Sequence, residues 1–368
     1  MLPLLNLGTE LFFWFLTFAL LIALTVLWHK LAHKKARHLG IRFVALLLLQ
    51  ILAISSVLIT INRSGEFYSS WGDLFGSKRN LSKIAINSNS LAEITQNDLS
   101  HAKRTALGSL IIRKVITGEH SGVSDVVYVV LSPKVAAAYT SSNNPVLPTN
   151  YQVVELFSGF PGVPQTWIGA LHGIDTIEQL EAQGQIKPTI AIIPNINVVP
   201  AQDSECLNIP KGAQVETWLS DDMHRFAKRF LGIDNRKWTS FGYSTGGWCA
   251  TELAVRHPHQ YARAISLAGY FSPSFETGIN KSMAKKLISE YDLITTIKTS
   301  ASNPALLVIA SKADHFYYKS ALKFVQESSP YLSAKFVEIP LGGHNLQVWH
   351  PYVETGMLWI NEQSANGN

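Results

Sequence analysis

Two long apolar runs stand near the start of the chain. The first covers residues 11–28 and has no charged side chain, and the second covers residues 43–61 with Gln50 as its only strongly polar side chain. An α-helix rises about 1.5 Å per residue, so each run is long enough to cross a hydrocarbon core of about 30 Å. A cleaved signal peptide is the alternative for the first run, but no positive region precedes it and no small-residue cleavage site follows it. The pattern predicts a two-helix membrane anchor over residues 1–62.

The rest of the chain changes character twice. Residues 63–109 are polar and keep neither a strand nor a helix period, which indicates a linker or an irregular collar. Short β-branched apolar runs then alternate with helical stretches, as in an α/β fold with a mostly parallel central sheet and flanking helices. We expect one domain over residues 110–361 and a tail over 362–368. The expected strands are 110–116, 126–131, 153–157, 189–193, 238–241, 264–267, 306–310 and 335–339, and the expected helices are 215–230, 247–256, 281–290, 318–327 and 348–360.

Charge between the two apolar runs predicts the orientation in the membrane. The loop that joins them has no acidic residue and carries five basic ones, Lys30, Lys34, Lys35, Arg37 and Arg42. The N-terminal flank carries only Glu10, so the positive-inside rule places the loop in the cytoplasm and the large domain outside the cell membrane. A nucleic-acid patch is the alternative, but the net charge of +5 equals the charge of this loop and requires no nucleic-acid partner.

The chain has two cysteines, Cys206 and Cys249. Both fall in the part predicted to lie outside the cell, where an oxidising compartment allows a disulfide. We therefore expect one bridge, with two buried free thiols as the alternative.

A serine motif stands in the middle of the α/β pattern. The segment FGYSTGG carries Gly242, Ser244 and Gly246 between an expected strand and an expected helix, which is the G-x-S-x-G nucleophile elbow. A serine hydroxyl is a weak nucleophile, so it must be held within reach of a base, and a tight strand-to-helix turn does this. The N-terminus of the following helix favours negative charge on a substrate oxygen.

A base and an acid follow the serine in the order that this motif requires. His344 lies in a glycine-flanked loop after the last strand, and an imidazole can take the serine proton near neutral pH. Asp314 follows the preceding strand and would orient the histidine, although it could instead cap the helix that begins after it. Asp221 and Asp222 are interpreted as the solvated face of their helix and are not expected to compete.

The oxyanion hole needs two backbone N–H donors. The residue after the nucleophile, Thr245, supplies the first. The loop after residues 153–157 supplies the second, with Phe160 as first choice and Gly159 as second, because Pro161 has no N–H.

Seven segments together resemble the "putative esterase" branch of the α/β-hydrolases, which includes esterase D and the actinobacterial mycolyltransferases. They are LFSGFPG, PNINVVPAQDSEC, VETWLSDDM, FGYSTGGWCA, HPHQYARAISLAGYFSP, ASKAD and LGGHN. The resemblance covers residues 110–360 and implies an α/β-hydrolase fold, a catalytic triad of Ser244, Asp314 and His344, and an oxyanion hole at Phe160 and Thr245. Mycolyltransferases are typically secreted without a two-helix anchor and commonly use Glu where this chain has Asp314, so mycolyl transfer is not carried over.

These features predict a membrane-anchored, extracytoplasmic serine esterase or acyltransferase that forms an acyl-serine intermediate on carboxylic esters, such as envelope lipids or glycolipids. We expect no metal or organic cofactor. The alternatives are a peptidase or thioesterase on the same triad, or a non-catalytic envelope protein that retains the fold. Residues 270–298 are expected to form part of a lid in which Phe271, Phe275 and Ile279 contact an acyl chain, with plain core packing as the alternative.

Overall fold

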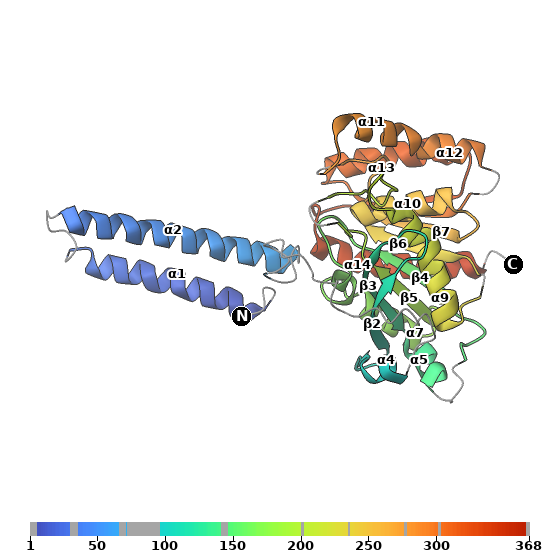
Figure 1. Ribbon diagram of the computed structural model, residues 1–368, viewed down its shortest axis with the longest axis horizontal. Coiled ribbons are helices and arrows are strands. Elements are labelled where there is room, and N and C mark those ends of the chain that lie inside the picture. The colour runs from blue at the N-terminus through green and yellow to red at the C-terminus, as the bar shows by residue number, and fades with distance from the viewer. Residues whose placement is uncertain are drawn as a thin grey trace. The chain divides into compact units, whose positions relative to one another are not determined.

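The computed structural model describes residues 6–29, 36–65, 71, 96–140, 146–199, 202–234, 236–275, 278–300 and 303–365. The chain divides into two compact units, Met1–Lys78 and Arg79–Asn368 (Figure 1). The first unit contains the helices of the predicted anchor, and the second contains the α/β domain.

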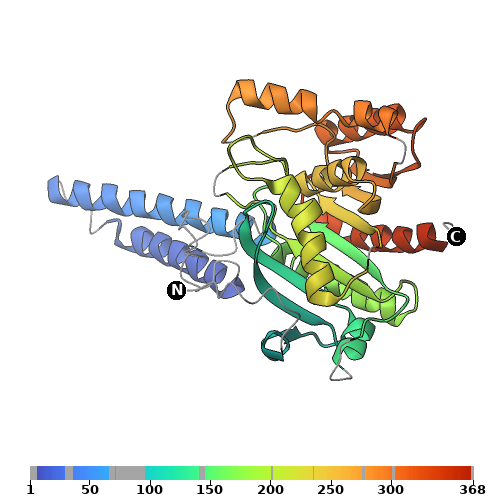
Figure 2. The same ribbon diagram turned by 45° about the vertical axis from the view of Figure 1, so that its right-hand side comes forward.

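In the described part of the first unit, two long helices, α1 (Leu7–Leu27) and α2 (Ala36–Gly65), lie side by side (Figures 1 and 2). Their polar side chains face each other: the hydroxyls of Thr17 and Ser56 are 3.0 Å apart, and Glu10 is paired with Arg63. The mean hydropathy of an 18-residue window is 2.2 within residues 7–27 and 2.6 within residues 39–63, and each helix is long and apolar enough to cross a membrane. The two apolar helices expected from the sequence are therefore present.

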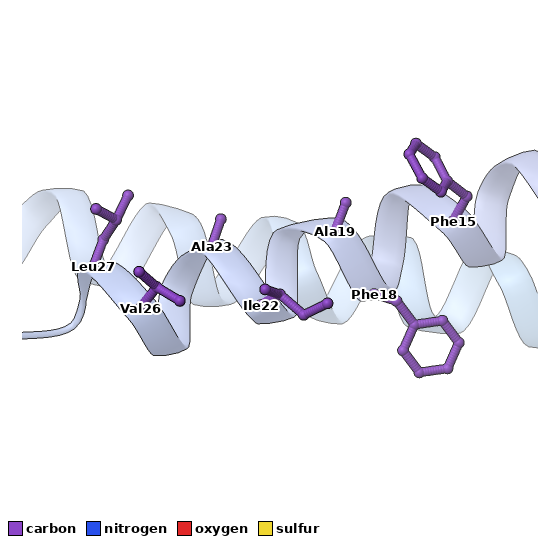
Figure 3. Close-up of a pocket in the computed structure, with 7 residues that line it drawn as sticks. All are labelled: Phe15, Phe18, Ala19, Ile22, Ala23, Val26 and Leu27. Carbon is purple, nitrogen blue, oxygen red and sulfur yellow. The ribbon is translucent and has the colours of Figure 1, made fainter.

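A shallow groove runs along one side of α1 (Figure 3). Large side chains line it at Phe15, Phe18 and Ile22, and the small side chains of Ala19 and Ala23 leave space between them. The lining has no polar side chain, so this groove offers no group that could take part in catalysis.

The second unit is built on a twisted central sheet. In the described part of the chain it has nine strands in the order β1-β2-β3-β5-β4-β6-β7-β8-β9. The pairs β1–β2, β2–β3 and β3–β5 are antiparallel. The remaining pairs, from β5 along the order to β9, are parallel. Their bounds are β1 Lys103–Arg104, β2 Leu110–Thr117, β3 Ser124–Leu131, β4 Gln152–Phe157, β5 Thr189–Pro194, β6 Trp238–Tyr243, β7 Tyr261–Leu267, β8 Ala305–Ser311 and β9 Ala334–Ile339.

All eight expected strands are present. The central strands β4, β5 and β6 are buried along their whole length, as strands covered on both faces are, whereas the edge strand β9 is only partly buried. Side chains alternate along each strand: Val153 of β4 joins the apolar core on one face of the sheet, and Val154 joins the core on the other. The short edge strand β1 lies inside the predicted linker and pairs with β2.

Helices cover both faces of the sheet (Figures 1 and 2). One apolar core contains side chains of α5 (Pro133–Thr140), α9 (Met223–Leu231), α10 (Thr245–Arg256), α11 (Lys281–Glu290), α12 (Leu293–Thr299) and α13 (His315–Ser328). The other core contains side chains of α6 (Gln165–Ile168), α7 (Gly173–Ala182) and α14 (Leu346–Ala365). A further short helix, α4 (Gln96–Ser100), precedes β1.

The helix expected over residues 215–230 is interrupted. It consists of α8 (Val215–Thr217), a π-helical segment over Trp218–Asp222, and α9. The wider π turn changes the phase of the side chains, and the Asp222 carboxylate is buried, where it accepts hydrogen bonds from the backbone N–H groups of His120 and Ser121 at 3.0 Å. The interpretation of Asp222 as part of a solvated face is therefore wrong, whereas Asp221 is partly exposed and pairs with Arg225.

Candidate active site

Ser244 occupies a tight turn between β6 and α10. Its backbone has φ 54° and ψ −125°, a region that a non-glycine residue adopts only when its surroundings hold it there. Its N–H donates to the carbonyl of Leu267 at 2.9 Å. A Cβ at Gly242 would collide with the backbone of Gly246, and one at Gly246 would collide with the carbonyl of Phe157. Both glycines of the motif are therefore required by close backbone packing around the serine.

His344 and Asp314 lie beside this serine. The His344 Nε2 atom is 2.9 Å from the Ser244 Oγ atom, and the His344 Nδ1 atom is 2.6 Å from the Asp314 Oδ2 atom. The three residues follow β6, β8 and β9, and the carboxyl ends of parallel strands meet at one edge of the sheet, where α/β folds place their sites. The structure thus brings together the three residues that the sequence predicts as a triad.

The position of Asp314 favours one of the two roles that the sequence leaves open for it. Asp314 immediately precedes α13, but its side chain makes no capping hydrogen bond to that helix. It faces His344 instead, and its side chain is only 13% exposed. The contact therefore favours orientation of the histidine over helix capping.

Two aromatic rings lie against the His344 imidazole. The ring of Tyr317 stacks on it at a centroid distance of 4.1 Å, and the ring of Trp349 lies nearly perpendicular to it at 4.5 Å. Burial lowers the pKa of His344 below its ordinary value, although the Asp314 carboxylate opposes this by stabilising the charged ring. The neutral imidazole, which can accept a proton, is thus favoured.

The loop expected to complete an oxyanion hole passes against the serine. A Cβ at Gly159 would lie 3.1 Å from the Cβ of Ser244, so the backbone of residues 158–162 lies close to the nucleophile. The Asn197 side chain donates to the carbonyls of Gly159 and Gly162 at 3.1 and 2.8 Å and fixes the loop on both sides of Phe160. Sequence reasoning misses Asn197, although its place just after a buried strand is a signal that could have found it.

Thr245 is the first residue of α10. The first N–H groups of an α-helix have no partner within the helix, so they can donate to a ligand. The oxyanion roles of Thr245 and Phe160 stay predictions, which this arrangement favours.

The expected disulfide is present. Cys206 and Cys249 are bonded, with their Cα atoms 5.7 Å apart and both residues buried. The bridge joins the segment after β5 to the helix that follows Ser244.

The segment expected to form a lid contains α11 and α12. Phe271 is buried and stacks on Phe324 at 4.1 Å, which is the core packing alternative. Phe275 and Ile279 are partly buried against the same core. Residues 276–277 lie outside the described residues, and the role of this segment as part of a lid stays a prediction.

A mostly parallel sheet with helices on both faces, a strand-turn-helix serine, and an acid and a histidine after later strands define the α/β-hydrolase fold. Two solved structures share this fold. An S-formylglutathione hydrolase from Agrobacterium tumefaciens has a TM-score of 0.57 and 15% identity, covering 71% of this chain and 97% of that one. The fluorophosphonate-binding serine hydrolase F of Staphylococcus aureus has a TM-score of 0.55 and 17% identity, covering 68% of this chain and 98% of that one.

The family follows from the sequence itself. The family model described as "Putative esterase" matches residues 144–359, more than half of the chain, and the chain belongs to this family. An uncharacterized protein of Corynebacterium glutamicum is 25% identical over an alignment of 231 residues that covers 58% of this chain and 53% of that protein. The chain thus spans about half the length of this curated relative. The family match confirms the predicted esterase family.

Proposed function

We propose that this protein is a serine esterase or acyltransferase that works through an acyl-Ser244 intermediate. The contact chain from Ser244 through His344 to Asp314, with distances of 2.9 and 2.6 Å, supports this most directly. A serine hydroxyl becomes a useful nucleophile when a base takes its proton and an acid orients that base. Membership of the esterase family supports an ester as the bond that is cleaved.

The first half of the reaction acylates the serine. The Ser244 Oγ attacks the ester carbonyl carbon while His344 Nε2 takes the hydroxyl proton, and the carbonyl oxygen becomes an oxyanion. The backbone N–H groups of Thr245 and Phe160 stabilise this charge. The bond to the alcohol then breaks as the imidazolium, stabilised by Asp314, gives its proton to the departing oxygen.

The second half repeats these steps with a new nucleophile. Water or a hydroxyl of an acceptor gives its proton to His344 and attacks the acyl carbon, and the Ser244 oxygen leaves and takes the proton back. Water completes hydrolysis, and an alcohol completes acyl transfer.

The anchor defines where this chemistry takes place. α1 and α2 are proposed to cross the cell membrane, with the basic loop between them in the cytoplasm and the catalytic domain, residues 110–361, outside. An enzyme held at the outer surface meets esters of envelope lipids or glycolipids, which we take as its substrate class.

The test is a substrate panel on the purified full chain in detergent. p-Nitrophenyl esters of short and long acyl chains, a thioester and an amide are compared for the wild type, Ser244→Ala and Ser328→Ala. Ser328 is a buried serine at the far end of α13 and serves as the matched control. We expect ester turnover in the wild type and the control, and none in Ser244→Ala. Ester turnover that survives in Ser244→Ala, or turnover of the amide alone, would contradict the proposal.

A further inference from the structure

A buried polar cluster that the triad does not use lies beside Thr245. The Tyr270 hydroxyl is 2.7 Å from both carboxyl oxygens of Glu205 and 3.2 Å from the Thr245 Oγ1 atom. Glu205 is 1% exposed, and Tyr270 and Thr245 are each 6% exposed. A buried carboxyl group is costly unless it is hydrogen-bonded or neutral, so the burial of Glu205, linked through Tyr270 to the residue after the nucleophile, calls for a physical reason.

The segment that carries Glu205 is tied to one face of α10. The Glu205 carbonyl accepts a hydrogen bond from the Trp248 indole at 2.9 Å, and Cys206 is bonded to Cys249. Positions 245, 248 and 249 lie on the same side of a helix because they are three and four residues apart. Glu205 and Cys206 both have positive φ, at 52° and 61°, and such backbone persists only where its surroundings hold it.

The ring of Tyr270 reaches the other half of the site. It stacks parallel to Trp248 at 6.2 Å and lies 5.9 Å from the ring of Tyr317, which itself stacks on His344. The Tyr270 hydroxyl therefore contacts Thr245, the residue after the nucleophile. The Tyr270 ring contacts Tyr317, which stacks on the base, His344.

We propose that Tyr270, held by Glu205, is a positioning residue that fixes the side chain of Thr245 and with it the direction of the Thr245 N–H toward the substrate oxygen. This inference rests on the proposed function, because it assigns that N–H to the oxyanion. Thr245 is the first residue of α10. Among the hydrogen bonds of the described residues, the one with Tyr270 is the only one that involves the Thr245 side chain, so it fixes the rotamer.

The state of Glu205 fits this role. Burial raises the pKa of its carboxyl well above the usual range, and the nearby Asp203 carboxylate raises it further. A neutral carboxyl can share a proton with Tyr270 without placing a second negative charge near the oxyanion.

The test compares hydroxyl deletions that keep the shape of the side chain. Tyr270→Phe and Thr245→Val should each lower kcat about tenfold, the scale of one neutral hydrogen bond, with KM changed less than about twofold. Because both substitutions remove the same contact, the kcat of the double variant should be no lower than that of either single variant. If the two side chains had independent roles, the two losses of kcat would multiply. Thr245→Ser should recover most of the kcat that Thr245→Val loses.

Tyr261→Phe is the matched control. The Tyr261 hydroxyl donates to the buried Glu155 at 2.7 Å, the same kind of pair, but Tyr261 begins β7, whereas the triad lies at the carboxyl ends of the strands. The Tyr261→Phe substitution should lower thermal stability and leave kcat unchanged. Equal kcat values for Tyr270→Phe and Tyr261→Phe, or multiplying losses in the double variant, would overturn the positioning role. Fluorophosphonate labelling of Ser244 in the wild type separates this outcome from failure of the proposed function, which would abolish labelling itself.

Discussion

At the scale of single residues, the protonation of His344 controls whether Ser244 can react. The imidazole must be neutral to take the serine proton, so kcat/KM is lost as pH falls through the pKa of His344. Burial lowers this pKa below the ordinary value of 6.5, so we expect the acid limb of the pH profile below pH 6.5. Asp314→Asn removes the carboxylate that raises the pKa and should move the limb further toward acid. A limb above pH 6.5 in the wild-type profile of kcat/KM would contradict this assignment.

Asp314 provides a second residue-scale prediction. Asparagine is as good a helix cap as aspartate, so a capping role for Asp314 would tolerate Asp314→Asn. Orientation of His344 would not, because the amide cannot stabilise the imidazolium, and we expect kcat to fall about 10³- to 10⁴-fold. The thermal unfolding midpoint should stay close to that of the wild type, since no capping bond to α13 is lost. Unchanged kcat in a correctly folded variant would remove Asp314 from the triad.

At the scale of elements, the disulfide joins α10 to the segment after β5. Cys206 and Cys249 are 43 residues apart, and closing a loop of that length stabilises the folded state by about 4 kcal/mol in the chain-entropy model. The double variant Cys206→Ala/Cys249→Ala should therefore unfold at a clearly lower urea concentration than the wild type. We expect the folded variant to keep most of its specific activity, because the hydrogen bond from Trp248 to Glu205 still joins α10 to the segment after β5. Equal urea midpoints would contradict a stabilising bridge.

The strands of the sheet could be predicted from the sequence more fully than its helices. Strands such as β4 and β5 are buried along their whole length, so their apolar runs stand out. The helix α7 is not among the expected helices, although Ile174, Ile177 and Leu180 form its buried face at intervals of three residues. The strand order, with β5 between β3 and β4, depends on pairing between distant segments that no local pattern encodes.

At the site, too, local sequence patterns predict some residues, whereas others depend on contacts between distant segments. Ser244, Asp314 and His344 could be found because each follows a recognisable strand in a fixed chain order. Tyr270 could not be assigned from the sequence, because its importance lies in hydrogen bonds to residues 25 and 65 positions away along the chain. Asn197 has a local signal, its place after a buried strand, but its hydrogen bonds reach residues 35 and 38 positions away. The burial of Asp222 was missed because a π-helical segment changes the phase that a regular helix would give.

At the scale of the whole molecule, the two apolar helices and the basic loop predict a two-pass topology. A periplasm- or surface-active reporter fused after Asn368 should be active, and a reporter that works only in the cytoplasm should be inactive at the same position. Replacing the five basic residues of the loop with Gln should weaken this bias, since those charges set the orientation. A cytoplasmic reporter that is active after Asn368 in the wild-type sequence would reverse the proposed orientation.

The activated state of Ser244 is the claim on which the whole account depends, and labelling with a fluorophosphonate measures it most directly. The purified full chain is incubated with the probe, and the labelled peptide is identified by mass spectrometry. We predict one labelled serine, Ser244, with no labelling in Ser244→Ala and labelling slowed by several orders of magnitude in His344→Ala, since the probe reacts only with a hydroxyl that a base activates. Folded protein that takes up no label, or that labels at Ser244 equally fast without His344, would contradict the account.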